Sequence, residues 1–338
     1  MFKYKTIFIV VVLAVLTGCF PSNDLAQQEV LLQGRTMGTT YSIKVIVENT
    51  YDTAKLQEKI DALLVQVNQE MSTYIPNSEL STFNQLASTE PVKISAGLQR
   101  VIKEAIRLGN LSEGKLDVTV GPLVNLWGFG PQHRPETVPS DEELALTKSQ
   151  TGLHYLSLKN NLLSKAIPEL YVDLSTIAKG YGVDIVAELI EANGINNYLV
   201  EIGGEMRVKG IKHTGELWVV AIEKPITTER AVQQAIVPKD NALATSGDYR
   251  NYFEVSGQRF SHIIDPDTGK PINHKLVSVT VIHPSSMTAD GLSTAMMVMG
   301  EEKALSFAEE NDIAAYIISK TENGFVEQST VKFMQYLK

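Results

Sequence analysis

Hydrophobic and polar positions predict one clear strand and two clear helices in the first third of the chain. Residues 39–47 alternate between apolar and polar side chains, which is typical of a strand with one buried face. Residues 52–71 and 95–113 instead repeat their apolar positions every three or four residues, which predicts amphipathic helices. Ser95 is the expected N-cap of the second helix, because its hydroxyl oxygen can accept a hydrogen bond from a free backbone N–H.

After about residue 150 the pattern predicts mostly strands. Helices are expected at about 176–192 and 288–310, and a long loop over 126–143, where Gly and Pro are frequent. The expected strands are 153–158, 169–174, 198–202, 205–211, 217–223, 251–255, 259–264 and 276–282. Because strands outnumber helices without regular βαβ alternation, the predicted fold class is α+β, with mostly antiparallel sheets packed with helices.

The N-terminus has the composition of a secretory signal. Its first five residues carry positive charge, residues 7–16 are all apolar, and Cys19 follows shortly after. This apolar run is too short for a stable transmembrane helix, which needs about 20 residues. A cationic start, a short apolar stretch and small residues before a cysteine resemble a bacterial lipoprotein signal, whose cysteine is lipidated. An ordinary signal peptide, or an uncleaved anchor with a chance cysteine, is the alternative.

Composition narrows the function classes further. The 338 residues are 43% hydrophobic, enough for a sizeable core in one large domain or two modest ones. The formal net charge is -9, so we expect no binding to nucleic acid, whose phosphates require clustered cations. Cys19 is the only cysteine, so the rest of the chain uses neither disulfides nor thiolate chemistry. With a lipid on Cys19, the protein is expected to lie outside the cytoplasm.

Residues 172–182 (VDLSTIAKGYG) are predicted to run from a strand into a helix. Such a junction leaves backbone N–H groups free at the positive end of the helix, which favours anions and phosphates. Lys179 adds a positive charge there, although the residue spacing of a P-loop is absent. A capped helix with an exposed lysine is the commoner explanation of such a pattern.

Asp290 and Thr294 lie four residues apart in a predicted helix, so both side chains project from one face. A carboxylate and a hydroxyl are oxygen ligands suited to a hard cation such as Mg²⁺. The sequence has no cluster of His and Cys for zinc. Alternatively, Asp290 lies in a first helical turn and only interacts with the helix dipole, while Thr294 faces the core.

Two further residues are candidates for chemistry, each with a structural alternative. Asp117 lies in an otherwise apolar, strand-like stretch at 114–122, so a buried Asp117 should have a specific partner. A turn or cap acid is the alternative there. His262 precedes a D-P-D-T-G turn at 265–269 and is a candidate general base, although a hydrogen-bonded structural histidine is more frequent.

A series of short blocks, taken in order, resembles the ApbE family of FAD:protein FMN transferases from about Leu31 to the C-terminus. The blocks are 34–41, 71–74, 77–84, 117–124, 126–130, 173–182, 201–205, 244–249, 262–269 and 289–294. The resemblance implies a single catalytic domain over 31–338 that is related to the T-fold. A lipoprotein signal peptide over 1–18 and a lipidated N-terminus and tether over 19–30 would precede it.

The resemblance implies a Mg²⁺-dependent enzyme that uses FAD as its substrate. FAD is split at its pyrophosphate, FMN passes to a Ser or Thr hydroxyl of a target flavoprotein as a phosphoester, and AMP leaves. The implied acceptors are flavoprotein subunits of membrane redox pumps that carry a Ser/Thr flavinylation motif. The implied location is the periplasmic face of a bacterial membrane, with the inner membrane favoured and a palmitate-type anchor on Cys19. A FAD pyrophosphatase that yields FMN and AMP, and a non-enzymatic flavin-binding lipoprotein, are the alternatives.

The family pattern also implies roles for single residues. Asp290 and Thr294 would supply side-chain oxygens to Mg²⁺, and Thr176 its backbone carbonyl. His262 would deprotonate the acceptor hydroxyl, so His262 and Asp290 are the expected catalytic residues. Many members have Gly-Gly where this chain has Ser175-Thr176, so the Thr176 side chain could crowd the approach. The expected FAD-lining residues are Met37, Tyr74, Lys115, Leu116, Asp117, Lys179 and Ile264.

Overall fold

The structure of the chain, a computed structural model, describes residues 26–130, 138–226, 231–249, 252–255 and 258–338. The expected signal over 1–18, the lipidation site Cys19 and the first part of the tether lie outside the described residues. The middle of the predicted loop at 126–143 also lies outside them. Across the described ranges, no helix combines the length and the apolar character needed to cross a membrane.

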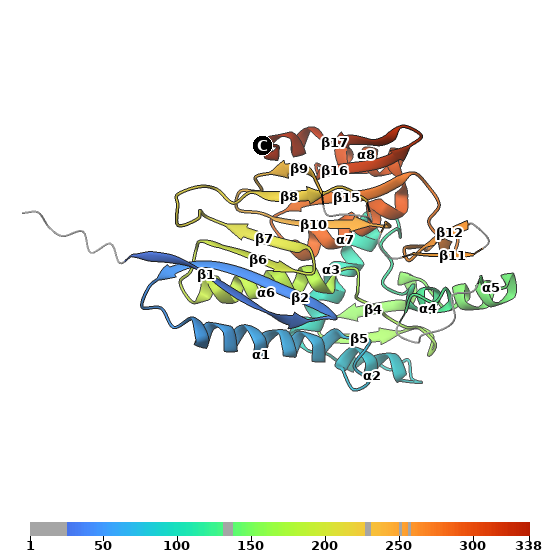
Figure 1. Ribbon diagram of the computed structural model, residues 1–338. Coiled ribbons are helices and arrows are strands. Elements are labelled where there is room, and N and C mark those ends of the chain that lie inside the picture. The colour runs from blue at the N-terminus through green and yellow to red at the C-terminus, as the bar shows by residue number, and fades with distance from the viewer. Residues whose placement is uncertain (1–25, 131–137, 227–230, 250–251, 256–257) are drawn as a thin grey trace, which may run out of the picture.

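A sheet of eight strands runs through the molecule (Figure 1). Every neighbouring pair in it is antiparallel, which confirms the predicted α+β class. Met37 and Gly38 connect the first two strands with φ of 49° and 72°, the positive values that a tight two-residue hairpin turn requires. In spatial order the strands are β1 (Gln27–Thr36), β2 (Thr39–Glu48), β6 (Tyr198–Ile202), β7 (Glu205–Lys209), β10 (Ala242–Gly247), β15 (Leu276–His283), β16 (Ala314–Thr321) and β17 (Gly324–Ser329).

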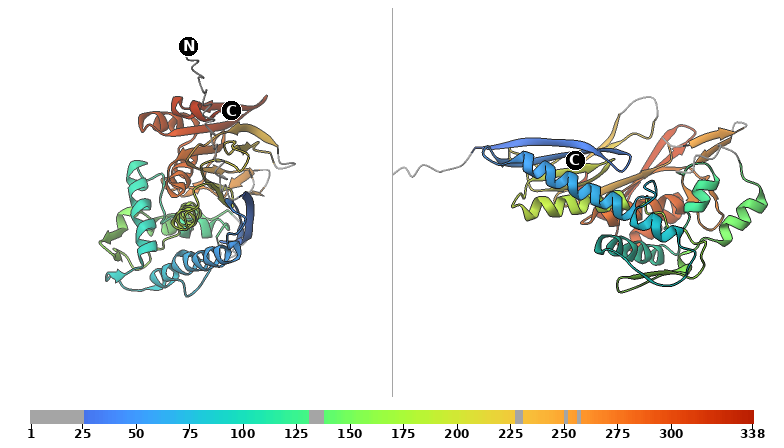
Figure 2. Two further views of the ribbon diagram at one scale, coloured as in Figure 1. Left: turned by 90° about the vertical axis from the view of Figure 1, so that its left-hand side faces the viewer. Right: turned by 90° about the horizontal axis from the view of Figure 1, so that it is seen from below.

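Helices cover one face of this sheet, and the main hydrophobic core lies between them (Figure 2). Among them, α6 packs on β6 and β7, and α7 packs on β10 and β15. The helices are α1 (Thr53–Met71), α2 (Glu79–Gln85), α3 (Ala96–Leu111), α4 (Gly121–Leu126), α5 (Asp141–Ser149), α6 (Ala178–Ala192), α7 (Ser286–Met299) and α8 (Glu301–Glu310). Two 3-10 helices, η1 (Leu153–Tyr155) and η2 (Val331–Tyr336), complete the set in the described residues.

The other face of the sheet carries a smaller core at its β15–β16 end. Along β16, Ala315 and Ile317 pack into the helical core, whereas Tyr316 and Ile318 pack with η2 and with residues of β8 and β9. This division follows from the period of two along a strand, which sends successive side chains to opposite faces. The short strands outside the main sheet are β3 (Val92–Lys93), β4 (Leu156–Lys159), β5 (Leu162–Lys165), β8 (Val220–Glu223), β9 (Val232–Ile236), β11 (Tyr252–Val255), β12 (Gln258–Ser261), β13 (Ile264–Asp265) and β14 (Lys270–Pro271).

The amphipathic helices and the first strand are confirmed, with α1, α3 and β2 at the predicted places. The Ser95 hydroxyl accepts a hydrogen bond from the N–H of Leu98, as expected for an N-cap. The predicted helix at 288–310 is wrong in its continuity, because Gly300 adopts φ of 78° and separates α7 from α8. The predicted loop at 126–143 is wrong at its end, where Ser140 forms a capping box with Glu143 and starts α5.

The predicted strand at 169–174 is also wrong, since this segment has no strand pairing. Its apolar side chains are buried, but the backbone of Val172 bonds to one side chain instead of a neighbouring strand. The Asn84 amide donates to the Val172 carbonyl at 2.8 Å and accepts from the Val172 N–H at 2.8 Å. A single, partly buried amide thus satisfies the backbone groups that a strand partner would otherwise satisfy.

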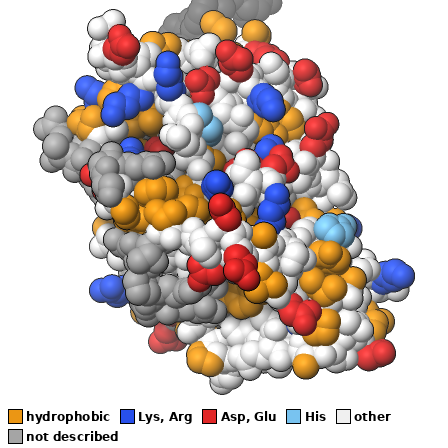
Figure 3. Space-filling view, turned by 90° about the vertical axis from the view of Figure 1, so that its right-hand side faces the viewer, with side chains coloured by type: hydrophobic (Ala, Val, Ile, Leu, Met, Phe, Trp, Pro, Cys, Tyr) orange, Lys and Arg blue, Asp and Glu red, His pale blue; other side chains and the backbone are white. Residues whose placement is uncertain are grey.

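The face that carries α4, α5 and the β11–β12 hairpin is drawn in Figure 3. Acidic and basic side chains are interspersed over it, and apolar side chains form separate patches. Among the described residues that this view shows, acidic side chains therefore separate the basic ones.

Candidate active site

Two adjoining cavities lie where the start of α6 and one side of α7 meet the ends of several strands. The first cavity has a volume of about 400 Å³ and the second about 670 Å³. Ser175 and Lys179 line both of them, so the cavities meet at the start of α6. Of the predicted site residues, the first cavity contains Lys115, Leu116, Asp117, Thr176, Lys179, His262, Ile264, Asp290 and Thr294, and the second contains Met37, Tyr74 and Lys179.

The start of α6 is completed by a carboxylate from another helix. No side chain of its own caps this helix, so its first N–H groups need partners from elsewhere. The carboxylate of Asp290 on α7 accepts a hydrogen bond from the Gly180 N–H at 3.0 Å. Asp290 is therefore not in the first turn of its own helix, as the dipole alternative supposed, but serves the N-terminus of α6.

Asp290 is almost completely buried at the wall of the first cavity. Burial, together with the nearby Glu205 carboxylate, raises the pKa of Asp290 to about 8, although Lys179 acts in the opposite direction. The charged form of Asp290 is thus disfavoured as long as no further positive charge reaches the cavity. A cation bound beside it would reverse this preference.

Lys179 lies between two carboxylates at the junction of the cavities. Its ammonium group forms an ion pair with Glu205 of β7 at 2.5 Å. Burial alone would lower the pKa of Lys179, but the carboxylates of Glu205 and Asp290 outweigh it and raise that pKa. Lys179 therefore keeps its positive charge at a point that borders both cavities.

Glu205 is a site residue that the sequence reasoning did not single out. It lines the first cavity, and its Oε2 atom is buried without a hydrogen-bond partner among the described residues. Burial raises the pKa of Glu205, while Lys179 lowers it. The Gly203-Gly204 pair was the available signal, because two glycines between strands predict a tight hairpin, which places Glu205 opposite Ile202.

The oxygen atoms around Asp290 fit a hard cation. The Thr294 hydroxyl lies one helical turn further along α7 and contacts the Ser246 hydroxyl at 3.1 Å. The Thr176 hydroxyl is buried and has no hydrogen-bond partner in the part of the chain that the structure describes. No group of three His, Cys, Asp or Glu side chains within the described ranges forms a metal site. The donors that line the cavity here are a carboxylate and hydroxyls, which suit Mg²⁺ rather than zinc.

Asp117 lies in a turn, so the strand-like interpretation of 114–122 is wrong. Its carboxylate accepts hydrogen bonds from the N–H and the hydroxyl of Thr119, at 2.7 and 2.6 Å. Burial raises the pKa of Asp117, and the bonds from Thr119 act against that rise. These bonds are those of a turn acid, as the structural alternative predicted, and Asp117 also lines the first cavity.

Lys115 connects this turn to the D-P-D-T-G segment. Its ammonium group forms ion pairs with Asp265 at 3.0 Å and Asp267 at 2.7 Å. Gly269 closes the segment with φ of 70° and donates its N–H to the Asp265 carbonyl at 2.8 Å. The turn thus has the Pro and Gly geometry expected from the sequence, and Lys115 fixes its position beside the first cavity.

His262 and Tyr74 lie at opposite ends of the combined space. His262 is partly buried in the first cavity, with its ring edge-on to Phe129 at a centroid distance of 6.3 Å. Tyr74 lines the second cavity and is 66% exposed, so its ring is not part of the hydrophobic core. Both rings are therefore placed where a ligand could contact them.

Comparisons with known proteins agree with this arrangement. The family described as "ApbE family" matches residues 37–317. A Vibrio cholerae protein named FAD:protein FMN transferase is 56% identical over 326 residues, which cover 96% of each chain. The Escherichia coli K12 protein of the same name is 41% identical, covering 94% of this chain and 92% of its own.

Solved structures give the same result. The structure "Flavin Transferase ApbE from Vibrio cholerae" matches with a TM-score of 0.86 at 55% identity, covering 92% of this chain and 100% of that one. The apo flavinyl transferase ApbE of Pseudomonas stutzeri matches with a TM-score of 0.85 at 39% identity, covering 92% of this chain and 97% of that one. The fold described above is therefore shared by proteins with a common name and activity.

Proposed function

Because this chain belongs to the ApbE family, we propose that it is an FAD:protein FMN transferase. It breaks the phosphoanhydride bond of FAD, forms a phosphoester between FMN and a Ser or Thr hydroxyl of an acceptor flavoprotein, and releases AMP. The observation that carries this proposal is the pair of cavities that meet at Lys179. FAD has two ring systems on either side of a pyrophosphate, and this space has two compartments on either side of a cation.

The charges at the junction support binding of a pyrophosphate. The positive end of the α6 dipole and the Lys179 ammonium attract phosphate oxygens. The buried carboxylates of Glu205 and Asp290 oppose this attraction, and the local charge of these three side chains is negative when both acids are ionised. A divalent cation would make the junction positive, which is why the geometry favours a metal-dependent reaction.

We propose that Asp290, Thr294 and the backbone carbonyl of Thr176 hold Mg²⁺. Bound there, the ion supplies charge neutralisation to the pyrophosphate, which stabilises the departing AMP. Lys179 binds and orients the phosphates, and Glu205 keeps its ammonium group in place. A ring nitrogen of His262 takes the proton of the acceptor hydroxyl as its oxygen attacks phosphorus.

One experiment separates this function from its alternatives. The purified protein is incubated with FAD, Mg²⁺ and an acceptor domain that carries a Ser/Thr flavinylation motif, and the acceptor mass and free nucleotides are measured. A transferase adds the mass of FMN to the acceptor and releases AMP. Free FMN and AMP with an unmodified acceptor would instead indicate a FAD pyrophosphatase. Bound FAD without AMP would indicate a flavin-binding protein.

We also propose that the protein acts at the periplasmic face of a bacterial membrane, anchored by lipid on Cys19. Its acceptors there would be flavoprotein subunits of membrane redox pumps. The support for this placement is the sequence pattern that ends at Cys19 and the tether of polar residues that follows it. A lipid on Cys19 would keep the catalytic domain beside membrane-bound acceptors.

Cys19→Ala is expected to remove the lipid and release the protein from membranes while leaving its catalytic domain folded and active. The physical reason is that the anchor lies outside the catalytic fold, which begins with β1. Membrane fractionation after a high-salt wash and transfer activity of the soluble fraction measure both effects. Ser22→Ala in the same segment is the matched control and should stay with the membranes. Complete retention of the Cys19→Ala protein on membranes would contradict the lipidation site.

Tyr74→Asn is expected to lower FMN transfer more than it lowers total FAD cleavage. The exposed ring at the second cavity can pack against the flavin half of FAD, a contact worth about 1–3 kcal/mol by analogy with base stacking. Without the ring, the flavin half is held less firmly in line for the acceptor hydroxyl, and water competes. Measuring protein-bound and free FMN in one reaction decides the matter, with Tyr74→Phe as the control that keeps the ring. An unchanged product ratio in Tyr74→Asn would remove Tyr74 from this role.

A further inference from the structure

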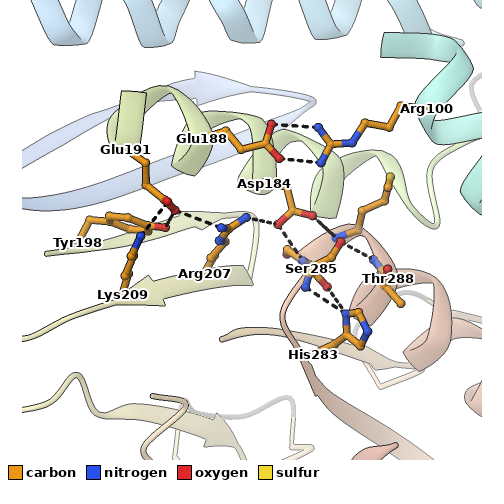
Figure 4. Close-up of polar contacts among 12 residues, drawn as sticks. Arg100, Asp184, Glu188, Glu191, Tyr198, Arg207, Lys209, His283, Ser285 and Thr288 are labelled. Atoms are coloured by element: carbon orange, nitrogen blue, oxygen red, sulfur yellow. Dashed lines mark hydrogen bonds and ion pairs between the residues drawn. The ribbon is translucent and has the colours of Figure 1, made fainter. Parts of the chain in front are cut away.

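A ladder of ion pairs joins α6 to β7 and begins at the active site, and Figure 4 shows the pairs formed by Asp184 and Glu191. Glu205, Arg207 and Lys209 alternate along β7, so their side chains point to the same face, the one that α6 covers. The ladder consists of Lys179–Glu205 at 2.5 Å, Asp184–Arg207 at 3.2 Å, Glu191–Arg207 at 3.1 Å and Glu191–Lys209 at 2.8 Å. Only its first pair borders the cavities, because Arg207 and Lys209 line neither of them.

The middle of this ladder reaches a second helix. Asp184 is fully buried, and its carboxylate caps the N-terminus of α7 (Figure 4). It accepts hydrogen bonds from the N–H groups of Ser286 and Met287, at 2.9 and 3.0 Å, and from the Ser285 hydroxyl at 2.7 Å. Free N–H groups at a helix start favour a negative charge, so this carboxylate fixes where α7 begins.

The capping is reciprocal between the two helices that carry the site. Asp184 of α6 binds the start of α7, and Asp290 of α7 accepts from the Gly180 N–H at the start of α6. The two turns also touch through their backbones. A Cβ atom on Gly180 would clash with the Ser286 carbonyl and lie 2.7 Å from the Met287 Cα. The point where the first turns of α6 and α7 touch is called the α6–α7 crossing here, and the relative position of Lys179 and Asp290 depends on it. Arg207, which lies on β7, connects this crossing to the sheet.

We propose that Arg207 is a positioning residue for the transfer reaction. Its guanidinium group donates to the same Asp184 oxygen that accepts from the Ser286 N–H. It thereby sets the position of the α6–α7 crossing and the separation of Lys179 from Asp290. This inference rests on the proposed function. The alternative is that Arg207 only adds to the stability of the fold, since breaking a buried ion pair is costly wherever it lies.

A double-mutant cycle distinguishes the two possibilities. Arg207→Met is expected to lower kcat/KM for FMN transfer about tenfold in the wild-type background, within the range of coupling seen between interacting residues. In a Lys179→Met background the same change should cost about threefold or less, because the group that Arg207 positions is gone. Arg207→Lys, which keeps the charge, should recover part of the lost activity. If the double variant loses activity by the product of the losses of Arg207→Met and Lys179→Met, the positioning role is wrong.

The matched control is another ion pair on the same helix. The Arg100 guanidinium, on α3, donates two hydrogen bonds to the Glu188 carboxylate at 2.7 and 2.9 Å. Glu188 lies on a part of α6 that faces α3 rather than β7. Arg100→Met removes the same positive charge beside α6, at a bidentate but more exposed ion pair, and should leave kcat/KM within about twofold of the wild type. A loss as large as that of Arg207→Met would show that any ion pair on α6 has the same effect, which overturns the proposal.

Amide hydrogen exchange provides a readout that does not require turnover. In Arg207→Met, the amides of Gly180, Ser286 and Met287 should exchange faster, because the caps that they donate to are loosened. The paired amides of β15 and β16 should keep their protection, and the melting temperature indicates whether the variant is folded. Unchanged exchange at the three amides contradicts the proposal. A wild-type protein without transfer activity contradicts the function instead, whatever the exchange shows. Should Arg207→Met not fold, the same comparison is made with Arg207→Lys.

Discussion

Replacing Asp290 with Asn is expected to slow FMN transfer by about two to three orders of magnitude at limiting Mg²⁺, the range found when one stabilising group of an active site is removed. Asn keeps the shape of the side chain, and its amide oxygen can still accept from the Gly180 N–H. The negative charge is lost, and Mg²⁺ needs such charge to exchange its waters for protein ligands. The effect therefore falls on the cation rather than on the fold.

Two measurements check this expectation. Raising the Mg²⁺ concentration should restore part of the activity, and calorimetry without FAD should show weaker Mg²⁺ binding by the variant. Asp312→Asn makes the same chemical change at an exposed position, where the residue pairs with Lys332 at 2.7 Å, and should behave as the wild type. Wild-type turnover by Asp290→Asn at limiting Mg²⁺ would remove this residue from the site.

The predictable part of the fold is the part in which local pattern and tertiary environment agree. Helices α1 and α3 have one face in the core and one in water, so their apolar residues recur at helical spacing. The strand β16 gave no such signal, because both of its faces are covered and its apolar residues therefore follow one another without alternation. The segment at 169–174 is apolar because it is buried, and only the distant Asn84 explains why it is irregular.

The candidate site shows the same division. Asp290 and Thr294 are four residues apart in α7, so helix geometry is enough to bring them to one place, and Thr176 lies in the turn that leads directly to Lys179 at the start of α6. The role of Glu205 depends on a hairpin that folds back over α6, and that of Asp184 depends on a helix about a hundred residues further along the chain. The residues next to a carboxylate in the sequence do not reveal a partner that lies about a hundred residues away. Asp184 and Glu205 are buried because distant elements pack over them, and the residues next to them in the sequence do not indicate this.

His262→Ala is expected to reduce FMN transfer to the acceptor by about 10²- to 10⁴-fold, the usual contribution of general acid–base catalysis. His262 lines the first cavity together with Asp290 and Thr294, close to the expected position of the phosphates. A ring nitrogen there can accept the hydroxyl proton as the new oxygen–phosphorus bond forms. The change should leave the affinity for FAD within about threefold, since the ring acts on the acceptor and not on the binding of the dinucleotide.

Three results together decide whether His262 is a base or a structural residue. A base predicts a loss of kcat with FAD affinity and melting temperature preserved, and partial recovery of transfer on addition of imidazole, which can fill the space left by the ring. His213→Ala is the control, because His213 is exposed near Glu29 at 3.8 Å and does not line either cavity. A structural histidine predicts instead that FAD affinity and melting temperature fall together with activity, and that imidazole restores nothing. The proton from the acceptor would then have to leave by another route, with Glu205, whose Oε2 atom is buried in the same cavity without a partner among the described residues, as the next group to replace.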